Sequence, residues 1–211
     1  MFSFQPAFLV LHGLRCHGLA DDQRLALAVD MSREKTAEIL HRLYRRGFVE
    51  YVPGPFGGWR LTPRGLATDN ELTSSELEES GARDRVYQCY RSLLRLHPGL
   101  LEIADDWDSR PVGGARITNT HRDRGYDTDV LSRLARIDEA AQWVYAELGD
   151  LLDRFGTYGL RFSRALERAL AGEHGYVTDR VDSYKAVWLQ LHEDLRSTLD
   201  ISGAEKRQHT S

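Results

Sequence analysis

The sequence predicts a mainly α-helical protein with one small β-hairpin near its N-terminus. Apolar residues recur at helical spacing before residue 47 and again after residue 82. In between, Phe48–Val52 and Trp59–Leu61 are rich in β-branched and aromatic residues, and Pro53–Gly58 is rich in turn residues. With 211 residues, the chain can form one large domain or two small ones.

We expect three helices ahead of the hairpin, at residues 6–16, 23–29 and 33–46. Ser32 is a good N-cap for the third helix, and Gly47 is its stop signal. The side chains that share the apolar faces of these helices, and are expected in the core, are Phe8, Leu9, Leu11, Leu14, Leu25, Leu27, Ala28, Ala37, Leu40, Leu43 and Tyr44.

A fourth helix is expected directly after the hairpin. Thr62 is suited to the N-cap and Pro63 to the first helical position. Three helices, a hairpin and another helix are the element order of a winged helix-turn-helix. We therefore assign residues 1–70 to a winged helix-turn-helix DNA-binding domain with a small β-hairpin wing.

The rest of the chain is expected to be a C-terminal helical domain. Residues 71–82 form an acidic linker or the end of the fourth helix, 83–202 a helical dimerisation domain with room for an effector, and 203–211 a flexible tail. Within the helical domain, His97-Pro98-Gly99 is expected to break the first helix, and residues 108–125 to form a long loop. Later helices are expected at residues 127–155, 158–171 and 183–199.

The helix at 127–155 offers the clearest candidate for a dimer interface. Its apolar residues follow one another at intervals of three or four, which suits a seam packed against neighbouring helices. A bundle within one chain is the competing interpretation. The aromatic residues of this domain similarly indicate either a core or a ligand pocket between helices, with Arg161 and Arg164 near Tyr158 able to neutralise an acidic effector.

Charge is distributed unevenly along the chain. The whole chain has a formal net charge of −4, but residues 1–70 hold nine basic and seven acidic side chains. Five of the basic ones fall within the fourteen residues 33–46. Because phosphate contacts are made by one face of one element, this local excess counts for more than the charge of the whole chain.

The third helix is therefore the expected DNA-reading element. A helix fits the major groove, where base edges present an unambiguous pattern of donors and acceptors. The first turn is placed to touch bases, while later arginines and those after the hairpin are placed to reach phosphates. The residues expected to contact DNA are Ser32, Arg33, Lys35, Thr36, His41, Arg42, Arg45, Arg46, Arg60 and Arg64.

Two motifs carry a family resemblance. The run SREKTAEILHRLYRRGFVE from Ser32 to Glu50 resembles the recognition helix and following strand of MarR-type winged-helix regulators. Leu61-Thr62-Pro63-Arg64-Gly65 is similar to the Leu-Thr-x-x-Gly that closes the wing in that family. The long helical C-terminal part is more similar to PadR-type regulators, which dimerise through such helices. The hairpin tip departs from the MarR pattern because it holds no Arg or Lys.

Other function classes have little support in the sequence. There is no Gly-rich phosphate loop, no Gly-x-Ser-x-Gly and no Cys–His nucleophile arrangement, so we expect no enzyme and no cofactor. His121-Arg122-Asp123 and His192-Glu193-Asp194 lie far apart and no His pair has i, i+4 spacing, so no metal site is expected. Cys16 and Cys89 are expected as buried thiols.

These observations predict a cytoplasmic transcription regulator. No apolar run is long enough to span a membrane, and the first residues lack the pattern of a signal peptide. The expected partners are double-stranded DNA, a second copy of the chain in a homodimer and a small-molecule effector, and repression is the expected mode. The alternative is a winged-helix adaptor that regulates a partner protein without binding DNA.

Overall fold

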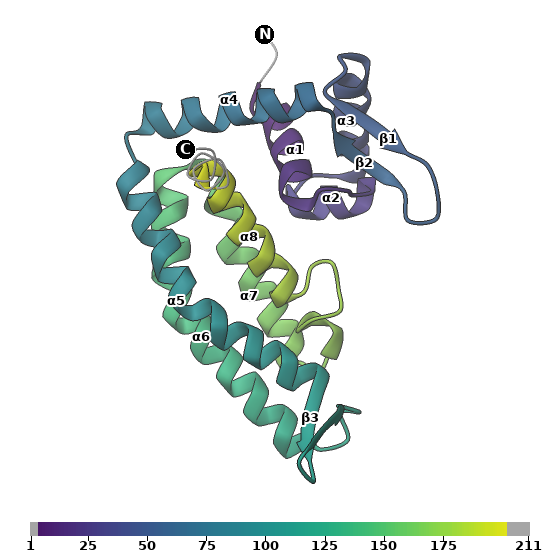
Figure 1. Ribbon diagram of the computed structural model, residues 1–211, viewed down its shortest axis with the longest axis vertical. Coiled ribbons are helices and arrows are strands. Elements are labelled where there is room, and N and C mark those ends of the chain that lie inside the picture. The colour runs from purple at the N-terminus through teal and green to yellow at the C-terminus, as the bar shows by residue number, and fades with distance from the viewer. Residues whose placement is uncertain (1–3, 202–211) are drawn as a thin grey trace, which may run out of the picture. The chain divides into compact units, whose positions relative to one another are not determined.

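A computed structural model describes residues 4–201 of the chain (Figure 1). The protein is mainly helical, with small two-stranded antiparallel hairpins. It divides into two compact units: one runs up to Val86 and also takes in the C-terminal segment from Gln190, and the other is Tyr87–Leu189. The predicted division instead placed the whole last helix in the second domain. The predicted tail at 203–211 lies outside the described residues.

The first unit contains the elements expected from the sequence. They are α1 (Phe4–His17), α2 (Asp22–Ala28), α3 (Arg33–Arg45), β1 (Val49–Val52), β2 (Gly58–Leu61) and α4 (Pro63–Ser80). The acidic stretch predicted as a linker or a helix end is the last part of α4, which stops at Gly81 in the left-handed conformation. Helix α1 packs on α3 and α4 (Figure 1).

Local capping chemistry sets where these helices begin. The side chains of Asp21, Ser32 and Thr62 accept hydrogen bonds from the backbone N–H groups three residues further along, at Arg24, Lys35 and Gly65. Each bond satisfies one N–H that the first turn of a helix leaves without a partner. The predicted helix starts are confirmed, because the signal for them is contained in a few neighbouring residues.

The β1–β2 hairpin is fastened to the first unit through Trp59. Trp59 pairs with Tyr51 across the hairpin, and its backbone also exchanges hydrogen bonds with Ala20, ahead of α2. A Cβ at Gly58 would lie 2.7 Å from the Ala20 carbonyl oxygen, so the close approach needs glycine there.

Gly65 shows why the Leu-Thr-x-x-Gly motif ends on glycine. A Cβ at this position would collide with the carbonyl oxygen of Phe48, at the start of the hairpin. Thr62 donates a hydrogen bond to the same carbonyl, 3.1 Å away. The first turn of α4 is thus pressed directly against the backbone that leaves α3.

The core of the first unit confirms most of the predicted apolar faces. Two predictions are wrong: the side chains of Leu27 and Tyr44 are 44% and 53% exposed. Ala26 is buried beside Leu27, and Leu43 beside Tyr44, because helical spacing alone does not decide which of two neighbouring apolar residues faces the core. The buried cluster comprises Val10, Leu11, Leu14, Ala20, Leu25, Ile39, Leu40, Leu43, Phe48, Val49 and Trp59.

The second unit contains most of the remaining helices and a further hairpin. Its elements, the first and last of which extend into the first unit, are α5 (Arg83–Asp108), β3 (Ser109–Val112), β4 (Ala115–Thr118), α6 (Arg124–Leu151), η1 (Asp153–Phe155), α7 (Gly156–Leu170), η2 (His174–Tyr176) and α8 (Tyr184–Thr198). Gly156, expected to end a helix, begins α7.

Two predictions for this unit are wrong. Helix α5 continues through Pro98, because Leu93 before it and Leu100 and Ile103 after it are all buried, and this packing outweighs the local cost of proline. The loop expected at 108–125 contains the β3–β4 hairpin, whose turn is made by two glycines with positive φ, Gly113 and Gly114.

The helix predicted as a dimer seam packs inside its own unit. Leu134, Val144 and Leu148 of α6 are at most 1% exposed, as is Phe155 just after it. These side chains therefore belong to a bundle within one chain, which was the competing interpretation. The largest side chains buried with them are Trp107, Trp188, Tyr184 and Phe162.

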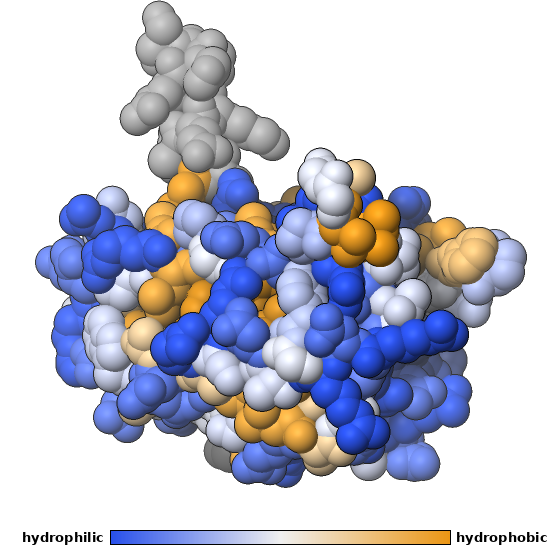
Figure 2. Space-filling model, turned by 90° about the horizontal axis from the view of Figure 1, so that it is seen from below, coloured by the Kyte–Doolittle hydropathy of each residue, from blue (hydrophilic) through white to orange (hydrophobic). Residues whose placement is uncertain are grey.

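The surface of the protein is largely hydrophilic. Hydrophilic side chains cover most of the face shown in Figure 2, with apolar patches between them. Over residues 4–201, no helix combines the length and apolar character that crossing a membrane requires. Cys16 and Cys89 form no disulfide within residues 4–201; Cys89 is buried as predicted, whereas Cys16 is only half-buried.

Candidate nucleic-acid interface

Helix α3 has one buried face and one exposed face. Ile39, Leu40 and Leu43 anchor it in the core of the first unit. Most of the residues predicted to contact DNA lie on the other face: Ser32, Arg33, Lys35, His41, Arg45 and Arg46 are exposed, and Arg42 is half-buried. The structure therefore brings most of the predicted side chains to one surface, here called the α3 face.

The prediction for Thr36 is wrong. Its side chain is fully buried, and its hydroxyl donates a hydrogen bond of 3.0 Å to the backbone carbonyl of Ser32. The Ser32 hydroxyl in turn accepts from the Lys35 backbone N–H. Both hydroxyls of the first turn thus stabilise the start of the helix, which leaves Arg33 and Lys35 as its outward polar groups.

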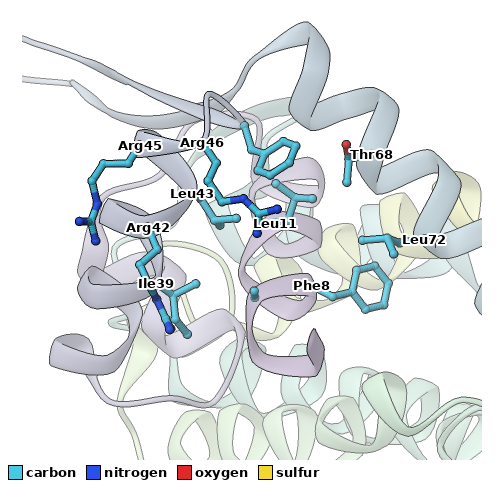
Figure 3. A pocket seen from close by; sticks show the side chains of 11 residues that line it. Phe8, Leu11, Ile39, Arg42, Leu43, Arg45, Arg46, Thr68 and Leu72 are labelled. Carbon is cyan, nitrogen blue, oxygen red and sulfur yellow. The ribbon is translucent and has the colours of Figure 1, made fainter. Parts of the chain in front are cut away.

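The positive charges of the α3 face are partly neutralised. Glu38 lies 3.5 Å from the Lys35 ammonium and 3.8 Å from the Arg42 guanidinium. Within residues 4–201, by contrast, neither Arg33 nor Arg45 forms an ion pair with an acidic side chain. In Figure 3, Arg45 points away from Thr68 and Leu72, towards the outside of α3.

Glu34 adds a negative charge to the first turn. Hydrogen bonds from its own backbone N–H and from the Ser32 hydroxyl lower the pKa of this carboxyl, so it is ionised at neutral pH. A carboxylate at a helix N-terminus is favourable for the helix itself. It also sits beside Arg33, so the first turn is less cationic than the later part of the helix.

Two predicted residues meet where α3 ends. The guanidinium groups of Arg46 and Arg64 lie 5.3 Å and 4.8 Å from the centre of the Phe48 ring. Arg64 also donates a hydrogen bond of 3.1 Å to the Arg46 carbonyl. Arg60 is placed differently: it lies across the hairpin from Glu50 and pairs with it at 2.7 Å, which balances its charge.

An aromatic cluster that the sequence did not reveal joins α3 to the hairpin. The edges of His41, Tyr44 and Tyr51 meet the Trp59 ring with centroids 5.2–5.9 Å apart. The Trp59 ring N–H is held by the Asp22 carboxylate at 2.8 Å. Tyr44 and Tyr51 are each more than half exposed. The sequence held one usable signal: Ile39 and Leu40 can supply the buried side chains of α3, which leaves Tyr44 available for the surface.

A pocket of about 370 Å³ lies beside α3, and arginines of the α3 face are among the residues that line it (Figure 3). Its apolar walls come from α1, α3 and α4, and Arg46 reaches in beside Leu11. A ligand pocket was expected among the C-terminal helices, whereas this one lies in the first unit. The residues that line it are Ala7, Phe8, Leu11, Ile39, Arg42, Leu43, Arg45, Arg46, Phe48, Thr68 and Leu72.

The fold also assembles two groups of metal-ligating side chains that sequence reasoning missed. One is His12, Cys16 and Asp194 in the first unit, and the other is His121, Asp127 and His174 in the second. Asp194 and His121, which the sequence analysis considered together, belong to different groups. The i, i+4 spacing of His12 and Cys16 on α1 was a usable signal, whereas the third member of each group, Asp194 or His174, comes from an element distant in sequence.

Comparison with known proteins adds no family assignment. No family model, curated protein or solved structure matches the chain. The chemistry of the α3 face therefore rests on its own geometry. It offers guanidinium groups on a helix that is anchored from behind, beside a hairpin and an exposed aromatic cluster.

Proposed function

We propose that the protein is a DNA-binding transcription regulator whose first unit acts as a winged helix-turn-helix. The observation that carries the proposal is the division of α3 into a face buried in the core and an opposite face with two arginines, Arg33 and Arg45, that form no ion pair with an acidic side chain among residues 4–201. Guanidinium groups on a rigid helix suit both guanine edges and phosphates. The α3 face supplies them without further rearrangement.

In this proposal α3 enters the major groove. Arg33 and Lys35 in its first turn face the base edges, while Arg45 and Arg46 at its end approach phosphates. The β1–β2 hairpin takes the place of the wing. Because its tip carries no basic residue and Glu50 balances Arg60, the hairpin adds little to phosphate binding.

We propose further that two copies bind together as a repressor. One helix makes few base contacts, and two half-sites add their binding free energies. Since most of the α6 seam is buried, a better candidate for the contact is an exposed apolar stripe on α5. It consists of Tyr87, Leu94 and Leu101, seven residues apart and 39–45% exposed. The pocket beside α3 would admit a small apolar effector.

A protein-interaction adaptor is the second candidate. The exposed Tyr44 and Tyr51 near the hairpin, together with Phe56 at its tip, which is 90% exposed, form the kind of aromatic surface that protein partners use. Glu34 and Glu38 on the α3 face would also repel DNA. If the protein is an adaptor, it should bind a partner protein through these aromatic residues, and this binding should not require duplex DNA.

Selection from a random duplex library tests the proposal and separates the two candidates. We expect enrichment of a palindromic sequence and protection of two half-sites in footprinting. Arg33→Gln combined with Arg45→Gln should weaken binding of the selected duplex at least about tenfold, as expected for loss of charged contacts. The matched control removes the same charge in the second unit, with Arg122→Gln and Arg124→Gln. Failure to enrich any sequence would favour the adaptor.

A further inference from the structure

Three potential metal ligands converge on one side of α1. His12 and Cys16 lie one turn apart on that helix, and Asp194 comes from the part of α8 that belongs to the first unit. The His12 Nε2 atom is 3.0 Å from the Asp194 Oδ1 atom and 3.6 Å from the Cys16 Sγ atom. All three donor atoms lie within 4.8 Å of one another.

These separations are close to the edges of a tetrahedral zinc site. With Zn–N of about 2.05 Å, Zn–S of about 2.3 Å and Zn–O of about 2.1 Å, tetrahedral angles place N and S about 3.6 Å apart and N and O about 3.4 Å apart. The first separation is matched, and the second requires a movement of a few tenths of an ångström. A set of one imidazole, one thiolate and one carboxylate suits zinc better than magnesium or calcium.

A buried carboxylate orients the histidine from behind. The Asp69 Oδ1 atom of α4 lies 2.9 Å from the other ring nitrogen of His12, Nδ1. Metal-binding histidines typically donate that second N–H to a carboxylate, which turns the lone pair of Nε2 towards the ion. The Thr198 hydroxyl donates to the Asp194 backbone carbonyl at 2.7 Å and lies 3.3 Å from the Asp194 Oδ1 atom.

Asp69 is also an independent sign that a positive charge belongs here. The residue is fully buried, and its Oδ2 atom has no hydrogen-bond partner in the part of the chain that the structure describes. A buried carboxylate that is only half satisfied is costly unless a nearby positive centre compensates it. His12 and Asp194 are each 4% exposed, whereas Cys16 is half-buried and gives an ion a route from solvent.

We propose that His12, Cys16 and Asp194 bind one zinc ion, with Asp69 as the positioning residue and the fourth coordination position open to solvent. Each ring nitrogen of His12 faces a carboxylate oxygen, so zinc at Nε2 takes the place of any proton held there. Zinc also displaces the proton of the Cys16 thiol, because the thiolate is the form that binds the metal. The ion links α1 to α8 directly and to α4 through Asp69.

Metal titration of the full chain tests the proposal. After removal of metal by a chelator, we expect one equivalent of Zn²⁺ to bind with release of protons at pH 7, measured by calorimetry in two buffers of different ionisation enthalpy. Co²⁺ should give tetrahedral visible bands and a thiolate-to-cobalt charge-transfer band in the near ultraviolet. This band reports the Cys16 ligand without any substitution.

Matched variants decide which residues hold the ion. Cys16→Ser should remove the charge-transfer band, and Asp69→Asn should weaken zinc binding about 10- to 100-fold. His174→Ala, which disrupts the exposed cluster of the second unit, should leave the stoichiometry and the band unchanged. The proposal is overturned if the wild-type chain shows no thiolate band with Co²⁺, or if zinc binding disappears in His174→Ala but persists in Cys16→Ser.

Discussion

The two β-hairpins are held in place by different forces. Val49 and Trp59 of β1–β2 are buried at 1% and 7% exposure, so the first hairpin is part of a hydrophobic core. Every residue of β4 is exposed, and Arg116 on that strand is instead bound by Asp105 and Asp106 at 2.9 Å and 3.0 Å. The first hairpin depends on burial, and the second on a tight turn and ion pairs.

The arginines of the two units also differ, because those near the second hairpin form ion pairs and some of those on the α3 face do not, among the residues that the structure describes. In the second unit, Arg110 pairs with Asp123, and Arg116 and Arg133 share Asp106. On the α3 face, Arg33 and Arg45 form no ion pair within residues 4–201. Arginines that already hold carboxylates serve structure, whereas unneutralised ones are available for phosphate. The comparison therefore favours the first unit as the site of the proposed DNA binding.

The largest expected effect is the removal of Trp59. Because this ring is buried and carries a hydrogen bond to Asp22, Trp59→Ala should lower the free energy of unfolding of the first unit by about 3–5 kcal/mol. Urea unfolding followed by circular dichroism measures this. Ile117→Ala on the exposed second hairpin is the counterpart and should cost no more than about 0.5 kcal/mol. Equal costs would contradict the distinction between the hairpins.

The turn of the second hairpin should matter more than its side chains. Gly114 has a φ of +86°, where a side chain is strained, so Gly114→Ala should cost about 1–2 kcal/mol. Faster hydrogen exchange in β3 and β4 would report the loss. Gly125→Ala is a suitable control, because it lies in helix α6 and a Cβ there makes only ordinary contacts. An unchanged exchange rate in Gly114→Ala would show that the turn does not hold this hairpin.

Acid should weaken the second hairpin through Asp106. Burial by itself raises the pKa of Asp106, but hydrogen bonds from Arg133 and Arg116 outweigh it and hold the pKa below its usual value. A lowered pKa in the folded state stabilises the fold above the ordinary carboxyl pKa of about 3.9, and this contribution is lost as the pH falls below that value. Asp106→Asn should flatten the dependence of stability on pH between about 2 and 5, while Asp105→Asn, at a more exposed site, should change it less.

The smallest effect tests the charge of the α3 face directly. Glu38 neutralises Lys35 and Arg42, so Glu38→Gln should strengthen binding to duplex DNA about threefold at moderate salt, in line with the small size of exposed ion pairs. Fluorescence anisotropy measures the affinity. Asp123→Asn frees Arg110 in the second unit and should leave DNA binding unchanged. A larger gain from Asp123→Asn would move the DNA-binding role to the second hairpin.

Local signals made most of the first unit predictable. The caps at Ser32 and Thr62 and the stop at Gly47 involve residues within a turn of each other, so they can be recognised along the chain. The hairpin at 49–61 could be predicted because its strands pack on a core and carry apolar residues. Gly65 belonged to a recognised motif, but its close contact with Phe48 needed the fold to explain it.

Features set by distant contacts could not be predicted. The strands of the second hairpin are exposed, so no hydrophobic pattern marks them. Helix α5 passes through Pro98 because buried residues hold it on both sides. His12 meets Asp69 and Asp194 from 57 and 182 positions away. The helical spacing of Tyr44 predicted a core position, yet its side chain is exposed, and Ile39 and Leu40 supply the buried side chains of α3.

The salt dependence of duplex affinity tests the role of the α3 face most directly. We expect the logarithm of the association constant to fall linearly with the logarithm of salt concentration, since binding releases counterions from phosphate. Arg45→Gln should reduce that slope by about one, the value for one lost phosphate contact. A chain with no duplex affinity even at low salt, or a slope unaffected by Arg45→Gln and Arg46→Gln together, would contradict DNA binding through this surface.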